Sequence, residues 1–423
     1  MNFLLFLKMN FSTSKRKGRA SEPASKERAE ERVANDASMS DLPFPILMDI
    51  FSRLPINTIL QIRSVCKTWF ALLSDPYFAE IHLARAPLSL MILTNFCQMI
   101  CSNSLEPLYK MNQNQKQNGQ NIPGKRFSLL TSCNGLLCSH EFSYKKEVVS
   151  ICNPILGEYL VLPQLERNRV DRRIRGFGFS QSSKQYKVIQ TLNYKNQAVE
   201  SNNFQVEIHT IGMDTWRNIG DLPYQLIQPY YGALLNGVFH WYAHSHDNKT
   251  AFMCSFDLGK EEFQSFPGPP IQGFGKCRPA NSISVGVSGG FLYLCDGFLE
   301  SNFDIWIMKN YGVKESWTKE FVIVNPTISK LQRVFGSMYI LNYRENMSKE
   351  ATEDTELVML LGSEDLFAYK VTSQAVRKPK STCIQSNYQA IPYIPSLVSV
   401  KMLQRKRVHW GFDLYVTPDS LNF

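Results

Sequence analysis

The chain has 423 residues, enough for two or three domains, and its content of 44% hydrophobic and 12% aromatic residues predicts a globular protein with a substantial core. Its apolar runs are shorter than the roughly 18 residues that cross a bilayer, so we expect no membrane as a partner. The net charge of +9 is spread along the whole chain, which argues against nucleic acid as a partner.

Residues 1–40 are rich in Ser, Lys, Arg, Glu and Ala and predict a disordered basic and polar tail. Phe3 to Leu7 is apolar but stops at Lys8, which is too short for a secretory leader. We therefore expect a cytoplasmic protein, a nuclear one, or both. Lys15 to Arg19 is either a solvated basic stretch or a nuclear import motif.

Residues 41–85 predict three short helices. Ile46, Leu47, Ile50 and Leu54 recur at helical spacing, and a second set recurs in the same way at Val65, Trp69, Leu72 and Leu73. Pro43 or Pro45 can open the first helix, Pro55 ends it, and Asn57 or Thr58 is a candidate cap for the second.

So small a module cannot bury its own apolar side chains, because surface is large relative to volume below about 40 residues. The order Leu-Pro, Ile-Leu, Leu-Pro, Leu, Ile-Arg, Val-Cys-Lys, Trp, Pro-x-Phe resembles the F-box, which docks on the Skp adaptor of cullin–RING ubiquitin ligases. The alternative is a helical hairpin that packs only on its own chain. The resemblance implies an adaptor-binding set made of Leu42, Pro43, Ile46, Leu47, Ile50, Leu54, Pro55, Leu60, Val65 and Trp69.

After Arg85 the helical period gives way to short β-type runs between Gly, Asn, Pro and Ser. Two units share one plan, in which an Asn-Gly turn opens an apolar strand and two further strands follow; they begin at Asn134 and Asn236. Such units recur about every 45 to 55 residues, the span of a four-stranded blade. Residues 90–400 therefore predict a β-propeller of five to seven blades, with residues 401–423 as a candidate for completing the last blade.

The same region resembles the F-box-associated, kelch-like region of plant F-box proteins. The resemblance rests on motifs such as Asn134-Gly135-Leu136-Leu137-Cys138, Cys152-Asn153-Pro154, Gly176-Phe177-Gly178-Phe179 and Asn236-Gly237-Val238-Phe239-His240-Trp241. The expected fold class is thus a multidomain α+β chain, with a three-helix F-box followed by a kelch-like propeller.

The sequence contains no H-E-x-x-H and no phosphate-binding loop of the G-x-x-x-x-G-K-[ST] pattern. His240, His244 and His246 could converge on a metal, but a role of His240 in strand packing fits its apolar surroundings better. The ten cysteines form no zinc spacing, and we expect thiols that pack as small hydrophobes. We predict no cofactor.

The resemblance implies a non-catalytic substrate receptor that binds a Skp-type adaptor, and through it a cullin–RING ligase, while the propeller binds a target protein. Candidate target-binding aromatics are Tyr230, Tyr231 and Phe274, which lie near prolines in loops. Two alternatives remain open from the sequence: a propeller-type enzyme of the sugar oxidase or sialidase kind, and an F-box scaffold or regulator that acts outside a cullin ligase.

Overall fold

The computed structural model describes residues 42–404, apart from short gaps at residues 95–96, 102–106, 113–125, 144–145, 164–169, 195–203, 228–230, 278–281, 298–301, 325–337, 341–355, 362–364, 371–372, 374 and 378–387. Among the described residues, α-helices come first, and strands follow, with one 3-10 helix between two of them, until a short α-helix at the end. The predicted tail at residues 1–40 lies outside the described residues. The described part contains no helix long and apolar enough to cross a membrane.

The helical module has four helices where the sequence predicted three: α2 (Phe44–Ser52), α3 (Ile56–Ile62), α4 (Lys67–Leu73) and α5 (Pro76–Arg85). The additional helix is α5. The Asp75 side chain caps it by accepting from the Tyr77 N–H at 2.7 Å, and Pro76 occupies its first position.

Prolines set the other boundaries much as the sequence predicted. Pro43 caps α2, and Pro55 lies just beyond its end. The predicted caps Asn57 and Thr58 lie inside α3 instead, because Pro55 is its N-cap residue. Val65 was expected on the helix with Trp69 but precedes α4, since Cys66 is extended and caps that helix through its sulfur.

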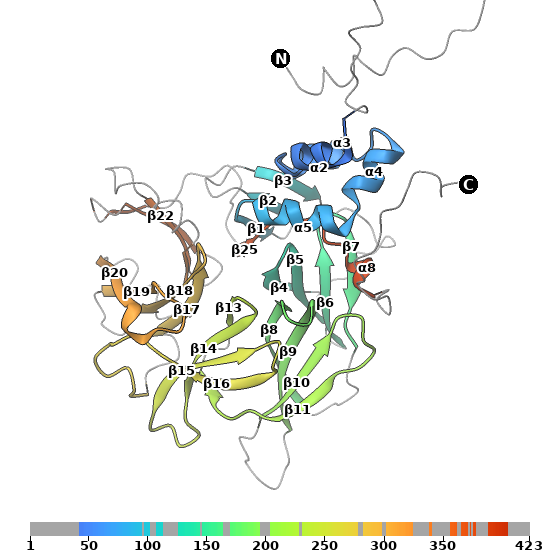
Figure 1. Cartoon of the computed structure of the whole chain (residues 1–423). Helices are drawn as coiled ribbons and strands as arrows, with labels where there is room; N and C mark the ends of the chain where they lie inside the picture. The colour runs from blue at the N-terminus through green and yellow to red at the C-terminus, as the bar shows by residue number, and fades with distance from the viewer. Residues whose placement is uncertain are drawn as a thin grey trace, which may run out of the picture.

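The described strands form six antiparallel sheets, which we number as blades (Figure 1). Blade 1 consists of β25 (Tyr388–Tyr393), β1 (Ser89–Thr94), β2 (Cys97–Cys101) and β3 (Pro107–Asn112). Blade 2 consists of β4 (Arg126–Cys133), β5 (Leu136–Ser143), β6 (Lys146–Asn153) and β7 (Glu158–Val161). Blade 3 consists of β8 (Val170–Ser180), β9 (Gln185–Tyr194), β10 (Phe204–Thr210) and β11 (Arg217–Asp221).

Blade 4 has five strands, because two short segments share its innermost place: β12 (Gln225–Leu226), β13 (Ala233–Leu235), β14 (Val238–His244), β15 (Ala251–Asp257) and β16 (Glu262–Phe266). Blade 5 consists of β17 (Ile283–Ser288), β18 (Phe291–Asp296), β19 (Asn302–Met308) and β20 (Trp317–Val324), with the short 3-10 helix η3 (Lys314–Ser316) between the last two strands. Blade 6 consists of β21 (Met338–Ile340), β22 (Glu356–Leu361), β23 (Asp365–Lys370) and β24 (Ala375–Arg377). Six sheets lie within the predicted range of five to seven blades.

The two Asn-Gly turns form as the sequence predicted. Asn134 and Gly135 have φ of 51° and 76°, and Asn236 and Gly237 have φ of 53° and 78°. Two successive positive φ angles characterise the hairpin turn whose twist matches that of the flanking strands. The first turn joins β4 to β5 in blade 2, and the second joins β13 to β14 in blade 4.

The ring is closed by β25, which pairs antiparallel with β1 from Ser89↔Tyr393 to Thr94↔Tyr388. From the sequence, residues 401–423, further along the chain, were the candidate for completing the last blade. The described part of that segment belongs instead to helix α8 (Val400–Gln404), and residues 405–423 lie outside the described residues.

Hydrophobic clusters join consecutive blades. One cluster combines Ile189 and Ile208 of blade 3 with Phe239 and Trp241 of blade 4. Gly176 lies opposite this cluster, where a Cβ atom would be only 2.5 Å from the Phe239 ring. Gly176 lies within strand β8, where its missing side chain lets the next blade approach.

Candidate functional site

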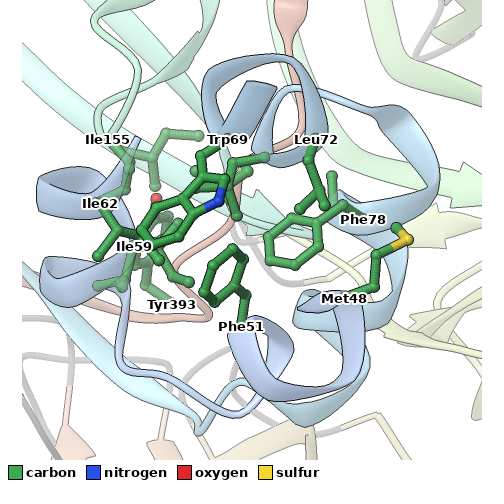
Figure 2. Packing of buried hydrophobic residues seen from close by; sticks show 14 of the residues in the cluster. Met48, Phe51, Ile59, Ile62, Trp69, Leu72, Phe78, Ile155 and Tyr393 are labelled. Atoms are coloured by element: carbon green, nitrogen blue, oxygen red, sulfur yellow. The ribbon is translucent and has the colours of Figure 1, made fainter. Parts of the chain in front are cut away.

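The helical module and the propeller share one hydrophobic core. Phe51, Trp69 and Phe78 lie at its centre, and the rings of Phe51 and Trp69 meet edge to face at 4.9 Å. Figure 2 shows Ile155 and Tyr393 of the propeller on the same side of this cluster as Ile59 and Ile62. The helices therefore rest on blades 1 and 2, which supply much of the cover that they cannot provide for themselves.

This packing divides the predicted adaptor-binding set into three groups. Leu47 and Trp69 are buried in the shared core. Ile50, Leu54 and Leu60 are half-buried against it. The exposed members are Leu42, Pro43, Ile46, Pro55 and Val65. The exposed members remain available to a partner, whereas Leu47 and Trp69 hold the module together.

Three further exposed hydrophobic side chains lie on the same helices and were missed from the sequence. They are Phe44 at the start of α2, Phe70 on α4 and Tyr77 on α5, each at least 50% exposed. We call these three, together with Leu42, Ile46 and Val65, the helical apolar surface. The inner stripe of α2 is Leu47, Met48 and Phe51, one position further on than the predicted Ile46, Leu47 and Ile50. Helical spacing alone does not indicate which of two adjacent stripes faces inward.

Charged groups fix the outer side of α2 and α5. The Asp49 carboxylate pairs with Arg53 and Arg85, both at 3.0 Å, and Arg85 also hydrogen-bonds the Ser52 hydroxyl. Hydrogen bonds from Arg53 and then Arg85 lower the pKa of Asp49 below its usual value. Both ion pairs therefore persist at neutral pH, and the one with Arg85 links α2 to α5.

A buried histidine makes a second link between these elements. His82 on α5 lies 3.1 Å from the carbonyl of Leu54, to which its Nε2–H donates. Burial lowers the pKa of His82, partly offset by this hydrogen bond, so the ring is neutral at pH 7. The contact fixes the chain between α2 and α3.

The Phe70 ring on α4 is exposed, and the guanidinium group of Arg63 lies over it, with the guanidinium carbon 4.8 Å from the ring centre. Arg63 also donates to the Ser74 hydroxyl at 2.9 Å. Burial lowers the pKa of Arg63, but a guanidinium stays protonated at any physiological pH. A positively charged group therefore lies beside the helical apolar surface.

The segment after β25 ties the module to blade 2. The amide of Asn153 donates to the carbonyls of Ser396 at 3.0 Å and Val398 at 2.8 Å, and its oxygen accepts from the Ile155 N–H at 2.9 Å. The Tyr393 hydroxyl donates to the carbonyl of Gly135 at 3.0 Å. The Asn-Gly and Cys-Asn-Pro motifs are thus the positions that hold the ring-closing segment beneath the helices.

The predicted target-binding aromatics are only partly accessible. Tyr231 is half-buried against the core between blades 2 and 3, and Phe274 is half-buried against Tyr242, with ring centres 5.5 Å apart. Tyr230 lies outside the described residues. Phe274 follows β16, the last strand of blade 4. Because successive strands of a blade run in opposite directions, β16 ends at the end of the blade opposite to its β13–β14 turn. The corresponding turns of blade 2 are the ones that meet the helical module, so Phe274 lies at the far end of the propeller from the helices.

His240, Cys133 and Cys152 are used for packing inside the blades. The Nδ1 of His240 lies 3.1 Å from the Ala233 carbonyl and its Nε2 lies 2.9 Å from the Tyr311 hydroxyl; burial lowers the pKa of this ring to about 4. Burial raises the pKa of Cys133 and Cys152 to about 12, which keeps both thiols protonated and unreactive. No group of three or more metal-ligating side chains gathers among the described residues.

Comparison with known families assigns both parts of the chain. A family model described as F-box-like matches residues 39–80, and one described as the F-box associated beta propeller domain matches residues 87–400. The chain is an F-box protein with an F-box-associated propeller. The two matches coincide with the helical module and with the six blades.

Relatives of this F-box protein occur in plants. The F-box protein At3g07870 of Arabidopsis thaliana is 30% identical over 69% of this chain and 74% of its own length. The F-box protein CPR1 of Arabidopsis thaliana is 26% identical over 85% of this chain and 89% of its own length. Among solved structures, the microbial sialidase Hz136 covers 60% of the chain and 57% of its own length at 13% identity with a TM-score of 0.36, a similarity too low to bear on activity.

Proposed function

We propose that this F-box protein is the substrate-recognition subunit of an SCF-type ubiquitin ligase. In this role the helical apolar surface binds a Skp-type adaptor, and the propeller binds a target protein. The chain itself makes and breaks no bond. It acts by raising the effective concentration of the target near the ubiquitin-carrying subunits, in the cytoplasm, the nucleus or both.

The observation that carries the proposal is the set of exposed hydrophobic side chains on an otherwise well-packed module. Leu42, Phe44, Ile46, Val65, Phe70 and Tyr77 stay exposed although the same helices bury a continuous core against blades 1 and 2. Exposed apolar side chains gathered on one small module are typical of a protein-binding surface. Membership of the F-box family supports a Skp-type adaptor as the partner.

The shared core supports the bridging role. The helices rest on blades 1 and 2 through Ile155, Ile391 and Tyr393, so the adaptor and the target would be held at a fixed separation. Loops at the far end of the blades, including the one that carries Phe274, point away from the helical module and remain the candidate target-binding face.

The proposal is tested by co-purifying the chain with a Skp-type adaptor. Phe44→Asp and Phe70→Asp each place a carboxylate on the helical apolar surface at an exposed position, so the fold should be retained while adaptor binding is lost. Val313→Asp, at an exposed apolar position in blade 5, is the matched control and should bind as the wild type does.

Circular dichroism and thermal melting of each variant establish that the fold is intact. Adaptor binding that survives both Phe44→Asp and Phe70→Asp in folded protein would contradict the assigned surface. A wild-type complex that contains the adaptor but recruits no cullin would instead favour an F-box scaffold that acts outside the ligase.

A further inference from the structure

A second set of exposed hydrophobic side chains lies on the propeller, where helix α8 ends. Tyr159 and Val161 are on strand β7, Met402 is on α8, and Met213 is in the turn between β10 and β11; all four are exposed. We call these four residues the α8-exit patch. It lies on α8 and on blades 2 and 3, and it shares no residue with the helical apolar surface.

Contacts around α8 bring these elements together. The Glu158 carboxylate at the start of β7 accepts from the Ser399 hydroxyl at 2.8 Å and from the Lys401 N–H at 3.4 Å. At the other end of α8, the Leu403 carbonyl lies 2.7 Å from the position that a Cβ on Gly212 would occupy. The chain therefore leaves α8 between β7 and the turn that carries Met213.

Strand β7 is also the outermost strand of blade 2, since the described sheet runs β4-β5-β6-β7. Its exposed side chains alternate, with Tyr159 and Val161 outward and Glu158 and Leu160 partly covered. In an antiparallel pair, every second residue turns its backbone N–H and C=O towards the partner strand, and the residues between turn theirs away from it. The Leu162 N–H donates to the Val149 carbonyl, so Leu162, and with it Leu160 and Glu158, faces β6. Tyr159 and Val161 consequently direct their N–H and C=O groups towards the open edge.

The sequence that follows Gln404 has the pattern of an edge-filling strand. Val408, Trp410, Phe412, Leu414 and Val416 alternate with His409, Gly411, Asp413 and Tyr415. Alternation with period two places all five apolar side chains on one face of an extended segment. When extended, Val408 to Val416 would span about 30 Å, more than the length of β7.

We infer that residues 405–423 cover the α8-exit patch of their own chain, with Val408 to Val416 lying extended along the open edge of β7. Three observations support this occupant: the segment starts where the patch lies, its apolar residues alternate as an added strand requires, and the edge that it would fill carries two exposed apolar side chains. An uncovered edge with apolar side chains is a site of unwanted pairing with other chains, and a segment tethered beside it has a high effective concentration there.

Amide hydrogen exchange of the full chain, followed by mass spectrometry, tests the inference. Peptides that cover residues 408–416 should exchange slowly in the wild type. In the double variant Tyr159→Lys and Val161→Lys, exchange of the same peptides should become faster by about tenfold or more. Val313→Lys, at an exposed apolar position in blade 5, is the control and should leave their exchange unchanged.

A variant on the other side of the contact guards against misfolding of blade 2. Trp410→Asp with Phe412→Asp should speed exchange of the Tyr159 and Val161 amides while the remaining strands of blade 2 stay protected. Exchange of residues 408–416 at the rate of a free peptide in the wild type would overturn the inference. Protection that survives both double variants, or that appears only as protein concentration rises, would also overturn it, the last by indicating a second copy of the chain as the occupant.

Discussion

Two adjacent residues of α2 should separate stability from adaptor binding. Leu47 is 4% exposed within the core shared by the helices and the propeller, whereas Ile46 is 47% exposed. Truncating a buried Leu to Ala costs about 2 to 5 kcal/mol, through lost burial and a residual cavity. We therefore expect Leu47→Ala to lower the free energy of unfolding by this amount, and Ile46→Ala to change it by less than about 0.5 kcal/mol.

Adaptor affinity should show the opposite order. Burying a whole Ile side chain is worth about 1.5 to 3 kcal/mol, and roughly half of Ile46 is still exposed before the adaptor binds. Ile46→Ala should then cost about 1 kcal/mol of binding, or about a fivefold rise in Kd. Folded Leu47→Ala should bind almost as the wild type does.

Urea denaturation followed by fluorescence gives the first quantity, and calorimetric titration with a Skp-type adaptor gives the second. The reasoning fails if Leu47→Ala keeps full stability but loses adaptor affinity, because Leu47 would then belong to the interface. It also fails if Ile46→Ala unfolds the module, because Ile46 would then be part of the core.

Three further predictions concern the propeller. Gly176→Ala should destabilise it by about 1 to 3 kcal/mol by urea denaturation, because the new methyl group would meet the Phe239 ring, whereas Gly275→Ala should be neutral because a methyl group there would have its nearest neighbour at 4.0 Å. Asn153→Ala should lower the midpoint of thermal unfolding, since it leaves the buried carbonyl of Ser396 and the partly buried carbonyl of Val398 without this donor. For His240, burial lowers the pKa from 6.5 to about 4, so below pH 6.5 the unfolded chain binds more protons than the folded chain. Between pH 7 and pH 5 the wild type should therefore lose about 2 kcal/mol more of its free energy of unfolding than His240→Gln does. Equal losses in the two proteins would contradict this prediction.

Sequence patterning located the helical module well but not its orientation. The prolines and the helical period predicted where α2 begins and that Leu47 and Trp69 are apolar contacts. They could not show that these two residues face the propeller, because the covering residues Ile391 and Tyr393 lie more than 300 positions away. The exposed rings of Phe44, Phe70 and Tyr77 were missed for the same reason: exposure is a property of the packed structure.

In the propeller, local turn chemistry was more informative than strand patterns. Asn-Gly at residues 134–135 and 236–237 specified positive φ and was confirmed at both turns. The closing strand β25 was not found, because Tyr-Gln-Ala-Ile-Pro-Tyr contains a proline and only a short apolar stretch. Its strand character comes from pairing with β1, a contact between the two ends of the domain that no local window contains.

The strand that closes the propeller is also part of the core beneath the F-box helices. Ile391 and Tyr393 pair with β1 on the closing strand and also enter the core that contains Phe51 and Trp69. The helical module therefore gains part of its cover from the strand that closes the ring, and this strand is in turn packed against the helices. An adaptor that binds the exposed side of these helices would consequently favour chains whose propeller is complete, because folding and binding are linked through one core.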